Sequence, residues 1–263
     1  FELEPCDIAL RRPARPDAYF DKVGRRFALL GTQGGTFEAW AYPLKLVRNF
    51  ELSFLLPTGT TPLRGRDLVR TVEATPAATI LTFVQESFTV RAIFVTSIDE
   101  PGAVVLLDVR SDGPLTIVCG FLPVLQPMWP AGLGGQYAAW NDSLKAYLLS
   151  EPTRRNHAFV GSPAARGISH TPAHMLSDVP NEFQVVIDDP GEVEGRFLPI
   201  VLAGGRGERE AVQKIYESLA ADPEKTYRRA EAYYRRFRNE TLRLSTPDPE
   251  INLAWEWASK ASR

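Results

Sequence analysis

Apolar and polar side chains alternate with a period of two over much of the first 205 residues, and this alternation constrains the fold more than any other feature. It is clearest in the segment 44–56, where the even-numbered residues are mostly apolar. A strand buried on one face requires that spacing, because its side chains point alternately to opposite faces. Strands are therefore expected at 27–30, 36–42, 44–56, 68–73, 78–84, 88–95, 103–109, 115–121, 146–149, 158–160, 183–187 and 197–202.

Turn-forming residues separate these runs at short intervals. Asp99–Gly102 and Ser111–Pro114 combine proline, glycine and small polar residues that favour tight turns. Short strands joined in this way indicate an antiparallel sandwich, whereas a parallel sheet would alternate strands with helices. A chain of 263 residues is long enough for one large domain of this kind. We therefore predict a mainly β protein, with a large antiparallel two-sheet β-supersandwich over residues 1–205.

The pattern changes to a helical period after residue 206. Residues 208–220 place apolar side chains on one helical stripe, and Asp222-Pro223 is typical of an N-cap followed by proline in the first turn. We expect linker helices over 206–244. A last helix at 251–258 has apolar residues around nearly its whole circumference. We interpret 245–263 as the start of a further domain in which this helix is buried.

Charge and hydropathy disfavour two classes of partner. The 30 basic and 32 acidic side chains leave a formal charge of −2, too little positive charge to hold phosphate backbones or an anionic membrane surface. The arginines between 228 and 238 are interleaved with Glu224, Glu231 and Glu240, as on a solvated helix face. No apolar run approaches the roughly 20 residues that cross a bilayer. We expect neither nucleic acid nor membrane as partner, and assign no compartment.

The sequence predicts no metal site and no cofactor. Cys6 and Cys119 are interpreted as two buried free thiols, with a single disulfide as the alternative. His170 and His174 have the spacing of a helical metal pair, but Pro172 between them opposes a helix. The glycines at 204–207 lack the lysine and hydroxyl residue of a phosphate-binding loop.

Three stretches together resemble a known family. They are 24–31 leading into 37–45, the loop 125–136, and Asp248–Trp257. They are similar to the N-terminal region of bacterial six-hairpin glycosidases, the (α/α)6-barrel hydrolases that are glycogen-debranching or glucoamylase-like. The resemblance implies a β-supersandwich at 1–205, a helical linker at 206–244, and at 245–263 the start of a truncated catalytic barrel.

The resemblance also implies that the catalytic carboxylates lie in that barrel. Glycoside hydrolysis needs two carboxyl groups facing each other across the scissile bond. Glu250 and Glu256, six residues apart on a helix, point about 120° away from each other. We assign no catalytic residue to this chain.

The segment 126–142 holds the residue types that bind sugars. Its tryptophans offer flat apolar faces, and its amides can bond to hydroxyl groups. Trp129, Gln136 and Trp140 are the candidate substrate-binding residues. The alternative is that Trp129 and Trp140 fill the sandwich core or its interface with the linker helices.

Three functions are weighed from these features. The first is a non-catalytic N-terminal domain of a modular glycoside hydrolase acting on α-glucan-like oligo- or polysaccharides, which packs on its own C-terminal barrel and helps to complete the active site. The second is a stand-alone carbohydrate-binding β-sandwich. The third, an epimerase or lyase built on the sandwich, needs a constellation of histidine with acidic or tyrosine partners that the sequence does not display.

Overall fold

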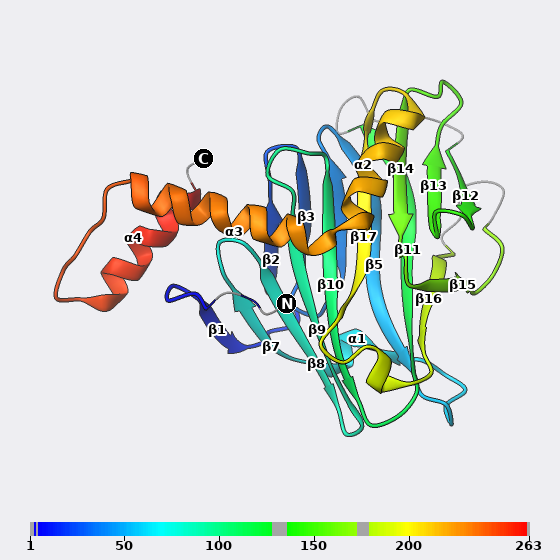
Figure 1. Cartoon of the computed structure of the whole chain (residues 1–263), viewed down its shortest axis with the longest axis horizontal. Coiled ribbons are helices and arrows are strands. Elements are labelled where there is room, and N and C mark those ends of the chain that lie inside the picture. Colours follow the sequence, from blue (N-terminus) through cyan, green and yellow to red (C-terminus); the bar gives the residue numbers. More distant parts are fainter. Residues whose placement is uncertain (1–2, 4, 128–135, 173–178, 262–263) are drawn as a thin grey trace.

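Two antiparallel sheets packed face to face make up most of the molecule, with helices on one side (Figure 1). The structure is a computed structural model that describes residues 3, 5–127, 136–172 and 179–261. The predicted fold class, a mainly β two-sheet sandwich followed by C-terminal helices, is confirmed.

One sheet has nine strands, each antiparallel to its neighbours. Their spatial order is β1 (Leu10–Pro13), β7 (Val69–Ala74), β8 (Thr79–Gln85), β9 (Phe88–Thr96), β10 (Gly102–Ser111), β17 (Phe197–Arg206), β14 (Asn156–Gly161), β13 (Ala146–Ser150) and β12 (Tyr137–Asn141).

The other sheet has eight strands. Seven follow the order β15 (Ala165–Ile168), β16 (Asn181–Ile187), β11 (Leu115–Pro127), β5 (Leu44–Leu55), β4 (Phe37–Ala41), β3 (Phe27–Thr32) and β2 (Tyr19–Val23). The two-residue β6 (Leu63–Arg64) pairs with β5. A helical turn α1 (Gly65–Leu68) and a 3-10 turn η1 (Pro190–Glu192) lie in the connections.

Aromatic rings fill the space between the sheets. Phe37 stacks on Phe50 with centroids 4.6 Å apart, and Phe50 stacks on Phe121 at 5.8 Å. Phe37 also meets Phe94 of the other sheet edge-to-face at 5.2 Å. These buried rings supply much of the apolar area that holds the layers together.

A second apolar cluster lies between the nine-stranded sheet and two helices, α2 (Arg209–Ala221) and α3 (Pro223–Glu240). Tyr216 of α2 packs on Phe159 of β14 with ring centroids 5.8 Å apart. The predicted N-cap is confirmed, because the Asp222 carboxylate accepts from Lys225 N–H at 3.0 Å and Pro223 begins α3. Helices are thus concentrated after Gly207, as the change of period predicts.

The helix α4 (Pro249–Ala261) folds back beside the free end of α3 (Figure 1). Trp257 Nε1–H donates to the carbonyl of Ile8 at 3.1 Å. Arg238 of α3 pairs with Asp7 at 2.6 Å and with Glu256 at 3.2 Å. These contacts fix the N-terminal segment between α3 and α4. Ile251 and Trp255 on α4 are 50% and 37% exposed.

Both cysteines are free, as the first of the two interpretations predicts, but Cys6 is only half-buried and not buried as expected. Cys119 lies in the core of the sandwich, where burial raises the pKa of its thiol. The sequence did not predict β1, β2 and β15 as strands. They are short strands at sheet edges, and β1 and β2 present exposed residues along much of their length, so the buried-face pattern is weak in them.

Candidate functional site

The outer face of the eight-stranded sheet differs from that of its partner, because α2 and α3 pack on the nine-stranded sheet. In β4 the side chains of Phe37, Ala39 and Ala41 are buried in the core, so Glu38 and Trp40 point outward. A polar and aromatic surface thus replaces the apolar layer found on the other sheet.

Three side chains on this face form one connected group, called here the Trp40 cluster: Glu38, Trp40 and Lys45. The Trp40 indole N–H donates to Glu38 Oε1 at 2.8 Å. Lys45 Nζ donates to Glu38 Oε2 at 2.5 Å and lies 4.6 Å from the centroid of the Trp40 ring. About 30% of the Glu38 side chain is exposed and 27% of the Lys45 side chain. The cluster is held in place yet open to solvent.

Strand register places this cluster beside the predicted sugar-binding segment. Trp40 of β4 lies opposite Lys45 of β5, and Lys45 lies opposite Gln126 of β11. Directly opposed residues of antiparallel strands share a face of the sheet. The segment 126–142 therefore begins next to the Trp40 cluster. Residues 128–135, including the candidate Trp129, lie outside the described residues.

The candidate Gln136 lies inside the protein. Its residue is 3% exposed, and its side-chain amide donates to the Leu125 carbonyl at 3.4 Å. This bond ties the middle of the segment to Leu125 of β11, the residue just before the segment begins. Anchoring the base of the segment is the role that this geometry supports.

The candidate Trp140 is half-buried and packs against the core. Its ring meets Tyr147 edge-to-face at 5.1 Å and stacks on Phe183 of the other sheet at 6.3 Å. The Tyr147 hydroxyl donates to the Glu182 carbonyl at 2.9 Å, a second bond between the layers. These surroundings match the alternative in which Trp140 fills the core at the end of the sandwich.

A buried serine–histidine pair that sequence reasoning missed lies where β13 meets β14. Ser150 Oγ is 3.0 Å from His157 Nδ1, and His157 Nε2 is 2.9 Å from the Arg154 carbonyl. A carbonyl only accepts, so Nε2 carries a proton and donates to it. The residues are 1% and 3% exposed and border a hollow of about 330 Å³ that Tyr137 also lines.

The neighbouring Glu151 explains how this turn is held. Burial opposes its ionisation, but hydrogen bonds from Thr153, Arg155 and Asn156 outweigh that effect and lower its pKa to about 2. The second ring nitrogen of His157 bonds to a backbone carbonyl, that of Arg154, and not to a carboxylate. The arrangement therefore stabilises the β13–β14 turn and lacks the carboxylate that orients a catalytic histidine.

Among the described residues, no group of three or more histidine, cysteine, aspartate or glutamate side chains is placed to hold a metal ion. His157 belongs to the turn just described, His170 is exposed, and His174 lies outside the described residues. None of the helices that the structure describes combines the length and apolar character of a membrane span.

Comparison with known proteins gives likeness in fold alone. No family model matches the sequence, and no curated protein sequence matches it either. The structure is similar to a bacterial glucoamylase complexed with acarbose, with a TM-score of 0.57 and 12% identity over 85% of this chain. The aligned part is 39% of the glucoamylase, so this chain spans well under half the length of that protein.

Two further solved structures are more distant. A kojibiose phosphorylase candidate from the human microbiome has a TM-score of 0.44 and 8% identity, covering 88% of this chain and 31% of its own. An aldose 1-epimerase candidate from Escherichia coli K12 has a TM-score of 0.41 and 12% identity, covering 72% of this chain and 99% of its own.

Proposed function

We propose that this chain is the non-catalytic N-terminal domain of a modular glycoside hydrolase that acts on α-glucan-like oligo- or polysaccharides. The observation that carries the proposal is the Trp40 cluster, an aromatic ring, a carboxylate and an ammonium group fixed together on the open face of a sheet. The likeness in fold to a bacterial glucoamylase complexed with acarbose also supports a role in a glycoside hydrolase.

The chemistry of the cluster suits a sugar. Indole rings stack on the C–H faces of pyranose rings, and charged groups bond to hydroxyl groups. Glu38 uses one lone pair on each carboxylate oxygen for Trp40 and Lys45, which leaves acceptor capacity on both oxygens. Lys45 likewise keeps donors for a ligand. In this proposal the cluster and the segment that begins at Gln126 form one sugar-facing surface.

The proposed domain organisation takes account of the alignment with the glucoamylase, in which this chain covers 39% of that protein. Residues 1–205 would form the supersandwich, 206–244 the helical linker, and 245–263 the first part of a C-terminal (α/α)6 barrel on which the sandwich packs. The extension of α3 and α4 past the end of the sheets supports this division (Figure 1).

Catalysis is assigned in this proposal to the barrel. Within this chain, Glu256 of α4 pairs with Arg238 at 3.2 Å and so ties α4 to α3, which gives that carboxylate a structural role. A stand-alone carbohydrate-binding sandwich is the second candidate, favoured by the fact that all three residues of the Trp40 cluster belong to this chain.

An assay for hydrolysis tests the proposal. The 263-residue chain, incubated with maltooligosaccharides, glycogen and aryl glycosides, should release no more sugar than a heat-inactivated control. Turnover that a single Asp or Glu substitution within the chain abolishes would contradict a non-catalytic role. The coding sequence after Arg263 separates the two candidates. A barrel with two facing carboxylates supports the modular hydrolase, and a stop codon supports the stand-alone module.

A further inference from the structure

Lys22, on the edge strand β2, is a buried charge. The residue is 9% exposed, and its side chain points inward like that of Phe20. Its Nζ donates to the carbonyls of Thr75 at 2.9 Å and Pro76 at 3.2 Å, in the turn before β8. These two bonds leave one of the three ammonium N–H groups without a protein acceptor in the part of the chain that the structure describes.

The charge of Lys22 also lacks a counter-ion there. Among the described residues, no carboxylate forms an ion pair with Nζ, and burial lowers the lysine pKa to about 8 although the nearby charge of Asp21 opposes this. Lysine is almost never buried in proteins unless it is paired. A buried ammonium of this kind needs an anion, and Lys22 opens onto a space that could hold one.

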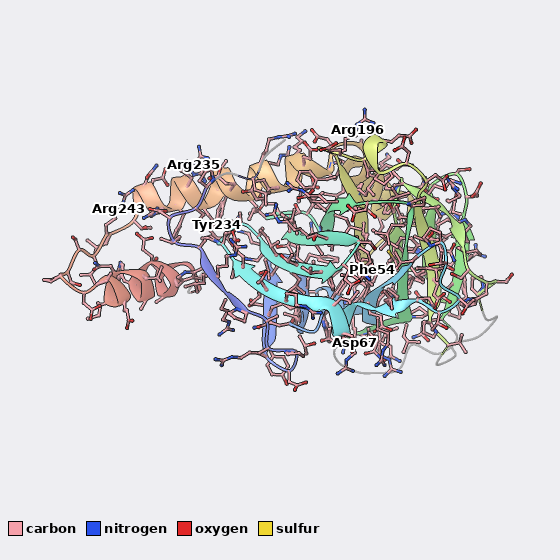
Figure 2. All side chains as sticks on the ribbon, turned by 90° about the horizontal axis from the view of Figure 1, so that it is seen from below. Phe54, Asp67, Arg196, Tyr234, Arg235 and Arg243 are labelled. Carbon is pink, nitrogen blue, oxygen red and sulfur yellow. The ribbon has the colours of Figure 1, made fainter. Side chains whose placement is uncertain are left out.

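That space is a cavity of about 710 Å³ where β1, β2 and β7 meet α3 and α4. It is as large as pockets that hold drug-sized ligands. In Figure 2, Tyr234 points from α3 toward the strands, whereas Arg235 points to the opposite side. The aromatic side chains that line the cavity are Tyr19, Phe20, Tyr233, Tyr234, Phe237 and Trp257.

The rim of the cavity is positively charged. Arg11 and Arg25 contribute to the lining but are paired with Glu73 and Asp99. Arg12 lines the cavity too and has no acidic partner among the described residues. Asp21 is the only acidic side chain among the lining residues that the structure describes. Charge complementarity therefore favours an anionic ligand.

We propose that this cavity binds a small organic carboxylate that carries a ring, whose carboxylate pairs with Lys22 and whose apolar ring face lies against the aromatic side chains. Sugar acids and aromatic acids share this chemistry. The cavity is separate from the Trp40 cluster, which lies on the outer face of the sheet, so the inference goes beyond the proposed function and does not rest on it.

Calorimetric titration of the 263-residue chain with two matched pairs of probes tests this site. The pairs are glucuronate with glucuronamide, and benzoate with benzamide, in which an uncharged amide of similar size replaces the carboxylate. We expect at least one acid to bind in a saturable manner and its amide to bind at least about tenfold more weakly, because the amide cannot pair with the ammonium. Which acid binds identifies the source of the carboxylate.

A substitution then assigns the effect to Lys22. Lys22→Met keeps the length of the side chain and removes its charge, and should weaken binding of the acid about tenfold or more. The matched control Lys214→Met removes an exposed charge on α2 and should leave binding unchanged. Binding of neither acid, equal binding of acid and amide, or undiminished binding by a folded Lys22→Met variant would each overturn the proposal. If Lys22→Met does not fold, the comparison of acid with amide on the unaltered chain still decides.

Discussion

The outer face of the nine-stranded sheet lies under α2 and α3, whereas the outer face of the eight-stranded sheet carries polar side chains to the surface. The strands differ accordingly. In β10 the residues from Ala103 to Leu107 are all buried, because one face meets the core and the other meets the helices. In β4 buried and half-buried residues alternate, and the outward positions hold Glu38 and Trp40. A continuous apolar run marks a strand covered on both sides, and alternation marks a face left open.

This difference separates residues that stabilise the fold from residues available to a ligand. Phe159 and Tyr216 join the helices to the covered face, and replacing either leaves a cavity. The Trp40 cluster sits on the open face, where substitution changes surface chemistry more than packing. The predictions below test this separation, from the largest expected effect to the smallest.

The covered face should be sensitive to truncation. Phe159 is 1% exposed and packs on Tyr216. Phe159→Ala should lower the free energy of unfolding by about 3–5 kcal/mol, through lost burial and the cavity left behind. Urea denaturation of the variant and the unaltered chain measures this. A loss below about 1 kcal/mol would mean that the helices contribute little to holding this sheet.

Trp140 tests where the core ends and a sugar-facing surface begins. Because it packs on Tyr147 and Phe183, Trp140→Ala should cost about 3 kcal/mol of stability. Trp129→Ala, by contrast, is predicted from the sequence to leave the melting temperature unchanged and to weaken oligosaccharide binding. Thermal melts and oligosaccharide titrations of the two variants measure both effects. Unchanged melting of Trp140→Ala with weakened binding would assign Trp140 to the ligand surface instead.

Glu151, in the β13–β14 turn, extends the predictions to pH. The pKa of Glu151 is about 2 in the folded protein against an ordinary value of 4.5, so its ionised form stabilises the fold above about pH 4.5. That contribution is lost as the pH falls toward 2, when the carboxylate is protonated. Glu151→Gln should be less stable at neutral pH and lose less stability between pH 5 and pH 2. Chemical denaturation across this range measures the change, and parallel curves for the two proteins would contradict it.

The ion pair between Lys45 and Glu38 on the open face should contribute least to stability. Lys45→Met removes one ion pair and one cation–π contact on a solvated surface. The free energy of unfolding should change by less than about 1 kcal/mol. Lys214→Met on α2 serves as the control for loss of a lysine charge. A larger loss in urea denaturation would show that the Trp40 cluster is part of the structural core.

Much of this architecture could be predicted from the sequence, because alternation and turn residues act locally. The strand 44–56, the N-cap at Asp222 and the change to helices after 207 are of this kind. Part of the Trp40 cluster could also be predicted, since Glu38 and Trp40 are two residues apart and so lie on one face of a strand. Its third member required the hairpin register that sets Lys45 opposite Trp40.

Other features depend on contacts that no local pattern contains. The carbonyls that hold Lys22 are more than 50 residues away along the chain. The core position of Trp140 depends on Phe183 in the other sheet. The amide of Gln136 makes it a candidate in the sequence, but only the folded chain shows that this amide bonds to Leu125 inside the protein. Residue type identified the chemistry in these cases, and tertiary packing decided its use.

The central claim is that the open face of the eight-stranded sheet is the sugar-facing surface, and titration of maltoheptaose into the unaltered chain and into Trp40→Ala tests it most directly. The unfolding free energy is measured on the same samples, with Phe159→Ala as the contrasting variant. We predict that Trp40→Ala stays folded and binds maltoheptaose markedly more weakly, while Phe159→Ala loses mainly stability. Binding by Trp40→Ala that equals that of the unaltered chain, or no binding by the unaltered chain, would contradict this account.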